Sequence, residues 1–71
     1  AMLQPHQQRV VEESQELLGR IERLQTFTDS PVFAGLDSAE RDRLLRQMSA
    51  MADYATVLAE RINAFPQGAT A

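Results

Sequence analysis

The sequence predicts an all-α fold: an antiparallel two-helix hairpin with a short helical connector, which assembles into a four-helix bundle or a larger homo-oligomer. Three observations predict it. Apolar residues recur at alternating steps of three and four in two long segments, which is a helix pattern and not a strand pattern. Turn-forming Pro31 and Gly35 lie between the segments. The apolar seams of the two segments also match each other when one of them is reversed.

The first helix is expected to run from Pro5 to Phe27. Proline suits the first helical turn, because the N–H that it lacks would have no partner there. Gly19 costs about 1 kcal/mol inside a helix, and it marks either a close contact between helices or a tolerated defect. The seam residues of this helix are Val10, Ser14, Leu17, Ile21, Leu24 and Thr28.

The connector spans residues 28–36. Ser30 followed by Pro31 predicts the start of a short helical turn, and Gly35 predicts its end. Its apolar side chains are unusual for a solvated loop, so we expect them to plug the end of the hairpin. They are Val32, Phe33 and Leu36.

The second helix is expected to open with a capping box, in which Asp37 is the N-cap and Glu40 reaches back to it. It then continues to Phe65, where Pro66 and Gly68 end it. The seam residues of this helix are Leu44, Met48, Met51, Ala55, Leu58, Ile62 and Phe65.

The two seams predict an antiparallel pairing in which facing residue numbers add to 72. Under this rule Leu17 faces Ala55 and Ser14 faces Leu58, so small residues oppose large ones. The hairpin domain covers residues 5–65. Residues 1–4 are expected to be disordered or partly an added leader, because Ala1 precedes the start signal Met2, and residues 66–71 are expected to form a disordered tail.

Composition excludes several classes of function. The 71 residues contain no cysteine and one histidine, which argues against thiolate catalysis, zinc–thiolate sites and histidine-based metal sites. A net charge of −3 argues against general nucleic-acid binding. No apolar run is long enough to span a membrane. No nucleophile lies next to a base, so we expect no enzyme, no catalytic residue, no metal and no cofactor.

Two helices alone leave much apolar surface uncovered, because a domain of this size buries only about 60% of its unfolded surface. The sequence therefore predicts a homo-oligomer, most simply a dimer. The alternative is a marginal monomer that folds on a host partner. The apolar residues outside the seam that we expect at the oligomer or partner interface are Val11, Leu18, Leu45, Tyr54 and Val57.

Arginines gather in the half of the hairpin near the connector, together with the N-terminus of the second helix. This arrangement predicts an anion or ligand contact formed by Arg20, Arg23, Arg43 and Arg46, with His6 or Tyr54 as a stacking ring. The alternative is a solvated surface on which acidic neighbours pair with these arginines. Those neighbours are Glu16, Glu22, Asp29, Glu40 and Asp42.

The chain also resembles a family of small phage-encoded helical-hairpin proteins with a Tyr-Gln-Gln-Arg-Val-type N-terminal motif, named after a crAss-like phage member. The resemblance rests on residues 5–13, Pro-His-Gln-Gln-Arg-Val-Val-Glu-Glu, and on further residues from both helices and the connector. These are Glu16, Leu17, Ile21, Leu24, Phe27, Phe33, Leu36, Glu40, Leu44, Leu45, Gln47, Met51, Tyr54, Leu58, Arg61 and Ile62. His6 stands where that family usually has tyrosine, and Ser14 where lysine is common. In architecture the chain is broadly similar to the phage quorum-sensing anti-activator, which binds host proteins, and to phage cyclic-nucleotide sponges.

The resemblance implies a non-catalytic phage protein of host takeover or counter-defence, acting in the host bacterial cytoplasm. We expect it to bind and inhibit a host regulatory or defence protein stoichiometrically. One alternative is an oligomeric sponge that sequesters a cyclic-nucleotide immune signal. A second alternative is a structural assembly or spacer protein, which needs only the helical bundle.

Overall fold

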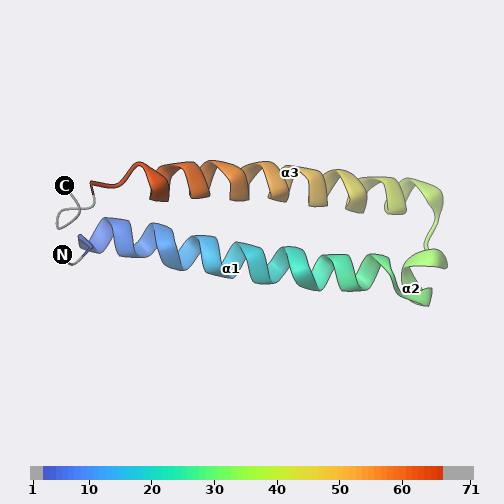
Figure 1. Cartoon of the computed structure of the whole chain (residues 1–71). Coiled ribbons are helices and arrows are strands. Elements are labelled where there is room, and N and C mark those ends of the chain that lie inside the picture. Colours follow the sequence, from blue (N-terminus) through green and yellow to red (C-terminus); the bar gives the residue numbers. More distant parts are fainter. Residues whose placement is uncertain (1–2, 67–71) are drawn as a thin grey trace.

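The computed structural model describes residues 3–66, which form an elongated helical rod (Figure 1). The helices are α1 (Pro5–Thr28), α2 (Pro31–Ala34) and α3 (Ser38–Asn63). The two long helices α1 and α3 lie antiparallel, α2 lies in the connector, and the rod measures 52 × 16 × 15 Å. The predicted all-α class is confirmed, and α1 packs against α3. The outermost parts of the expected flanks, residues 1–2 and 67–71, lie outside the described residues.

Helix α1 begins one turn ahead of its apolar seam. Gln4 is the N-cap residue, and its backbone N donates to Oε1 of Gln7 at 2.8 Å. Gln7 is a buried polar residue, three positions before Val10, so the buried stripe starts earlier than the apolar pattern predicts. At the other end, the hydroxyl of Thr28 donates to the carbonyl of Gln25 at 2.8 Å, and α1 ends there, one residue beyond its expected end.

The connector contains the predicted helical turn. The hydroxyl of Ser30 donates to the carbonyl of Phe27 at 2.6 Å and accepts from the backbone N of Phe33 at 3.3 Å. Gly35 ends α2 with right-handed backbone angles. The expectation that all three apolar side chains plug the hairpin is wrong for Val32, which is 64% exposed. Neighbouring residues point about 100° apart on a one-turn helix, so Val32 and Phe33 cannot both face the long helices.

Helix α3 opens at Asp37, whose Oδ1 accepts from the backbone N of Glu40 at 2.7 Å. Only this half of the predicted capping box forms. The carboxylate of Glu40 instead accepts from Nε of Arg43 at 2.8 Å, because an arginine one turn onward offers a charged donor. The helix ends at Asn63, two residues earlier than predicted, and Phe65 nevertheless packs against the core from beyond that end.

The predicted seam is confirmed, since each of its residues on both helices is buried or half-buried. The most buried apolar side chains are Val10, Leu17 and Leu58, and Leu58 has no exposed surface. Around them pack Ile21, Met51, Ala55, Ile62 and Phe65. The core thus lies toward the end of the rod away from the connector. At that distant end the two long helices are held by packing, whereas near α2 they are held by the connector.

Gly19 does not mark a close approach of the helices. A Cβ atom built at this position meets only the guanidinium of Arg23, from the same helix, at 3.4 Å. Of the two readings of this glycine, the close contact is therefore excluded, and Gly19 is a tolerated weak point in α1.

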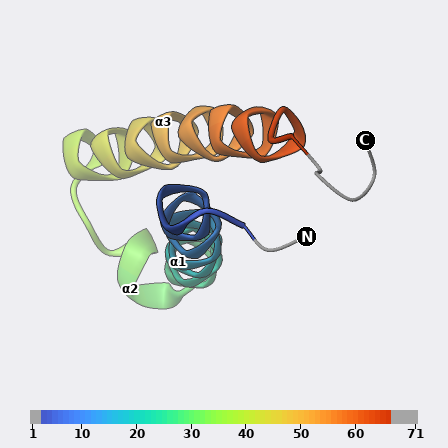
Figure 2. The same cartoon turned by 90° about the vertical axis from the view of Figure 1, so that its left-hand side faces the viewer.

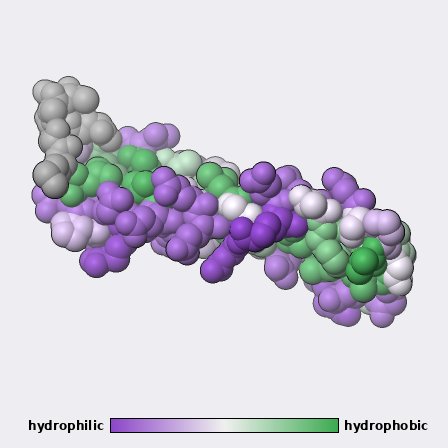
Figure 3. Space-filling view, turned by 90° about the horizontal axis from the view of Figure 1, so that it is seen from below, coloured by the Kyte–Doolittle hydropathy of each residue, from purple (hydrophilic) through white to green (hydrophobic). Residues whose placement is uncertain are grey.

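Much apolar surface stays uncovered on the hairpin. Leu18, Leu45, Tyr54 and Val57 are exposed, and Val11 is half-buried. Figure 2, in which α1 is seen nearly end-on, shows that α3 passes along only one side of α1. Hydrophobic residues reach the surface toward both ends of the rod when it is seen from the α1 side (Figure 3). No helix among residues 3–66 is long and apolar enough to cross a membrane.

Candidate ligand-binding face

The heptad pattern divides the hairpin surface into two flanks. The steps of the seam assign its residues alternately to heptad positions d and a, starting with d at Val10 on α1 and at Leu44 on α3. In an antiparallel helix pair, the residues that follow a d position share one flank, and the residues that precede an a position share the other flank. We call the first flank the alanine face. Its members each follow a seam residue and include no arginine: Val11, Leu18, Leu45, Ala52 and Ala59.

We call the opposite flank the arginine face. Arg20, Tyr54 and Arg61 each precede a seam residue and lie directly beside the seam. Four further residues occupy the c positions next to them, on the same side: Arg9, Arg23, Arg43 and Val57. Five of the chain's seven arginines therefore lie on one face, although the net charge of the whole chain is −3. This clustering makes the arginine face the candidate site.

Arg20 and Tyr54 form the centre of this face. Both precede an a position, so they share one flank, Arg20 on α1 and Tyr54 on α3. Their residue numbers place them at nearly the same height along the rod. Tyr54 is half exposed, so its ring is accessible to a ligand. Within residues 3–66 neither Arg20 nor Arg23 has an acidic partner within 4.0 Å. Both guanidinium groups are therefore available to an external anion.

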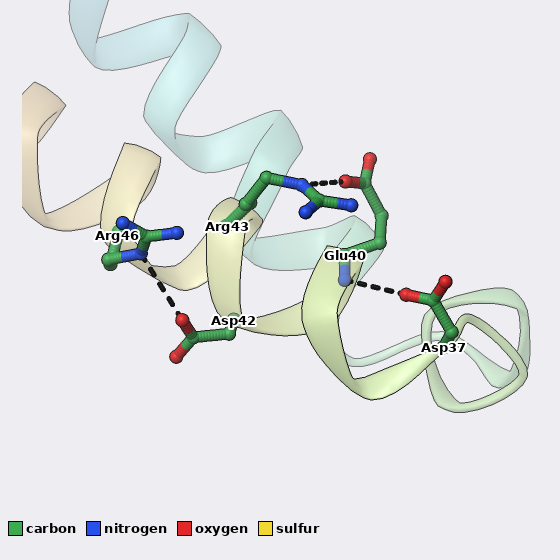
Figure 4. A network of polar contacts seen from close by, with 5 residues as sticks. All are labelled: Asp37, Glu40, Asp42, Arg43 and Arg46. Atoms are coloured by element: carbon green, nitrogen blue, oxygen red, sulfur yellow. Dashed lines mark hydrogen bonds and ion pairs between the residues drawn. The ribbon is translucent and has the colours of Figure 1, made fainter.

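The other two predicted arginines are partly engaged within their own helix (Figure 4). Nε of Arg43 lies 2.8 Å from Oε1 of Glu40, and Nε of Arg46 lies 3.2 Å from Oδ2 of Asp42. Both pairs are solvent-exposed, and exposed pairs contribute only about 0.2–1 kcal/mol. A phosphate that binds two arginines at once can therefore displace these carboxylates. Of the five acidic neighbours considered, only Glu40 and Asp42 form such pairs.

His6 lies apart from the arginines. It precedes Arg20 by fourteen residues on the same straight helix, which separates their backbones by about 21 Å at 1.5 Å per residue. His6 and the four predicted arginines therefore do not meet within one chain. Of the two candidate rings, only that of Tyr54 lies, by the register of the seam, at nearly the same height as Arg20 and on the same flank.

Arg41 was not among the predicted contact residues, and its position in line with the seam sets it apart from the arginine face. Its Nε atom is buried and has no hydrogen-bond partner among the described residues. Arg41 stands three positions before Leu44 and so extends the apolar seam, a signal that predicts burial of its stem. At the connector, the rings of Phe27 and Phe33 pack edge to face with centroids 6.2 Å apart.

The chemistry that this face offers is recognition of an anion that carries a flat ring. Guanidinium groups bind phosphate or carboxylate oxygens in pairs, and a tyrosine ring stacks on a planar base. Among the described residues no three acidic or histidine side chains are grouped so that they could hold a metal ion. The arrangement is that of a binding surface on a small helical hairpin.

The fold defines a small all-α protein whose two long helices pack as a hairpin. A family model described as Sequestin matches residues 4–64, which is nearly the whole hairpin, and the chain belongs to the Sequestin family. The family name indicates a protein that sequesters a partner. Comparison with curated proteins gave no match, and neither did comparison with solved structures.

Proposed function

We propose that this chain is a non-catalytic counter-defence protein of a phage, which acts in the host bacterial cytoplasm by sequestering an anionic signal stoichiometrically. The signal class is a cyclic nucleotide, and the hairpin acts as a homo-oligomer. The family name supports sequestration, while the phage setting rests on the resemblance described above. The observation that carries the ligand class is that Arg20, which has no ion-pair partner among residues 3–66, shares a flank and nearly a height with the exposed ring of Tyr54.

A cyclic nucleotide suits this face in two ways. Its phosphates carry the negative charge that Arg20 and Arg23 lack among their described neighbours. Its bases are planar and offer a surface to the ring of Tyr54. A sponge also needs no catalytic group, and it works at concentrations comparable to those of the signal.

The test is a thermal-shift titration with cyclic mono-, di- and trinucleotides. A ligand present at 100 times its dissociation constant stabilises the folded state by about 2.7 kcal/mol. For a domain of this size that corresponds to a rise in melting temperature of about 10 °C or more. Linear dinucleotides of equal charge serve as ligand controls. The absence of a shift with every cyclic nucleotide at millimolar concentration would refute this ligand class.

Two variants localise the binding. Arg20→Gln removes the central guanidinium and is expected to abolish the shift, because nothing in the described structure depends on that charge. Arg9→Gln is the matched control, since Arg9 likewise has no ion-pair partner among residues 3–66 and lies about 16 Å away along α1. A shift that survives Arg20→Gln and is lost with Arg9→Gln would place the ligand elsewhere on the hairpin.

A host regulatory or defence protein is the second candidate partner. The observation that favours it is the exposure of Tyr54 and Val57 on the arginine face, because aromatic and arginine side chains are typical centres of protein interfaces. Capture from a bacterial lysate followed by gel filtration distinguishes the two. A defined complex that resists Arg20→Gln and breaks with Tyr54→Ala would favour the protein partner over the nucleotide.

A further inference from the structure

We propose that the alanine face of the hairpin packs against the alanine face of a second copy of this chain, giving a two-fold symmetric four-helix bundle with both arginine faces outward. The proposal rests on the self-association proposed above and names the surface that performs it. The expected interface residues thereby separate into two groups. Val11, Leu18 and Leu45 bind the second copy, whereas Tyr54 and Val57 belong to the ligand face.

The first argument is that the isolated hairpin buries few apolar side chains. Its described residues include only three buried apolar side chains, all from the seam. Leu18 remains 54% exposed and Leu45 47% exposed on the alanine face. Covering the exposed half of each of these side chains would remove further apolar surface from water, which favours association. An interface that covers Leu18 and Leu45 on each of two chains adds buried apolar surface to the small core of each hairpin.

The second argument is the shape of the alanine face. Along the seam, Leu18 of α1 lies at nearly the height of Ala52 of α3, and Val11 lies at nearly the height of Ala59. In the two layers away from the connector, α1 thus contributes the larger side chains and α3 the alanines, whereas near the connector the large side chain of the face is Leu45 on α3. A two-fold rotation can place Val11 and Leu18 of each copy over the alanines of the other. Self-complementarity of this kind favours a second copy over an unrelated partner.

The third argument is charge. The alanine face has no arginine, whereas the opposite flank and its c positions carry five. Packing two alanine faces together therefore buries no guanidinium group, and burying an unpaired charge would be costly. Packing two arginine faces together would instead bring ten guanidinium groups into one interface. Charge thus separates the surface for the second copy from the surface for the ligand.

The fourth argument is size. The rod is 52 Å long and 16 Å wide, so one face covers at most about 830 Å², close to the roughly 800 Å² per partner of a standard stable interface. The face is large enough for a stable dimer only when the hairpins align along their length. Aligned packing of this kind gives a four-helix bundle, whereas crossed packing buries too little surface.

The experiment compares two variants with matched exposure. Leu18→Glu places a charge on the alanine face, and Val57→Glu places the same charge on the arginine face, where the side chain is 50% exposed. Mass is measured by light scattering at micromolar concentration, and helicity by circular dichroism. We expect the wild type and Val57→Glu at twice the chain mass of 7.9 kDa, and Leu18→Glu at 7.9 kDa.

Three results would overturn the proposal: a monomeric wild type, a larger assembly than a dimer, or a dimer broken by Val57→Glu and not by Leu18→Glu. If Leu18→Glu unfolds the chain, Leu18→Ala takes its place, and we expect its dimer dissociation constant to rise at least tenfold. An unchanged constant would contradict the interface. A monomeric wild type that still shows the nucleotide shift would overturn the dimer and leave the sequestration standing.

Discussion

Replacing Leu58 by alanine tests the core most directly. Leu58 has no exposed surface, and it packs with Val10 and Leu17. Truncation of a buried leucine costs about 2–5 kcal/mol through lost burial and the cavity that remains. In a hairpin the two helices can partly close such a cavity, so we expect about 2–3 kcal/mol. Chains of this length have about 4–10 kcal/mol of stability in total, and the variant therefore loses a large share.

Urea unfolding followed by helical circular dichroism measures this loss, with every variant at one protein concentration. The midpoint is expected to fall while the slope with urea stays constant, because the same surface is exposed on unfolding. Val57→Ala is the control, since Val57 is half exposed, and it is expected to change stability by less than about 0.5 kcal/mol. If Leu58→Ala costs less than about 1 kcal/mol, or no more than Val57→Ala, the assignment of the core is wrong.

Three smaller effects follow from local geometry. Gly19→Ala is expected to raise stability by about 0.5–1 kcal/mol, because the new methyl group meets only the flexible end of Arg23; a fall in melting temperature would indicate a helix contact at Gly19. Asp37→Ala removes the acceptor for the backbone N of Glu40 and is expected to cost about 1 kcal/mol, whereas Asp37→Asn retains most of it; equal losses in urea unfolding would contradict the cap. Glu40→Gln breaks the exposed pair with Arg43 and is expected to change stability by less than about 0.5 kcal/mol, and a larger loss in the same assay would mean that the pair supports the connector.

Most of the fold follows from the sequence, because the spacing of apolar residues within each helix determines which of its faces packs against the other helix. The reversed match of the two seams could be found without coordinates, and so could Ser30 and Asp37 as caps. The exposure of Val32 could not, because the direction of a one-turn helix depends on how Phe33 packs against Phe27. The hydrogen-bond partner of the Glu40 side chain was also predicted wrongly, because the capping box and the ion pair with Arg43 compete for the same carboxylate.

The candidate site was less predictable than the fold. Counting the arginines near the connector grouped residues that lie on different faces of the rod. Assigning each residue to its flank of the seam separates Leu18 from Tyr54 and removes His6 from the arginine set. Whether an arginine is paired depends on side-chain rotamers, which the sequence does not encode. Arg23, for example, lies over Gly19 and not against a carboxylate.

The position of the core has a consequence for how the chain reaches its native state. The connector can form early, because its hydrogen bonds join residues only three or four apart. The deepest packing, in contrast, joins Leu17 and Val10 to a leucine more than forty residues later, so much longer loops must close to form it. Folding is therefore expected to begin at the turn and to finish at the far end. The barrier is then set by that last closure, so substitutions in the core should mainly speed unfolding.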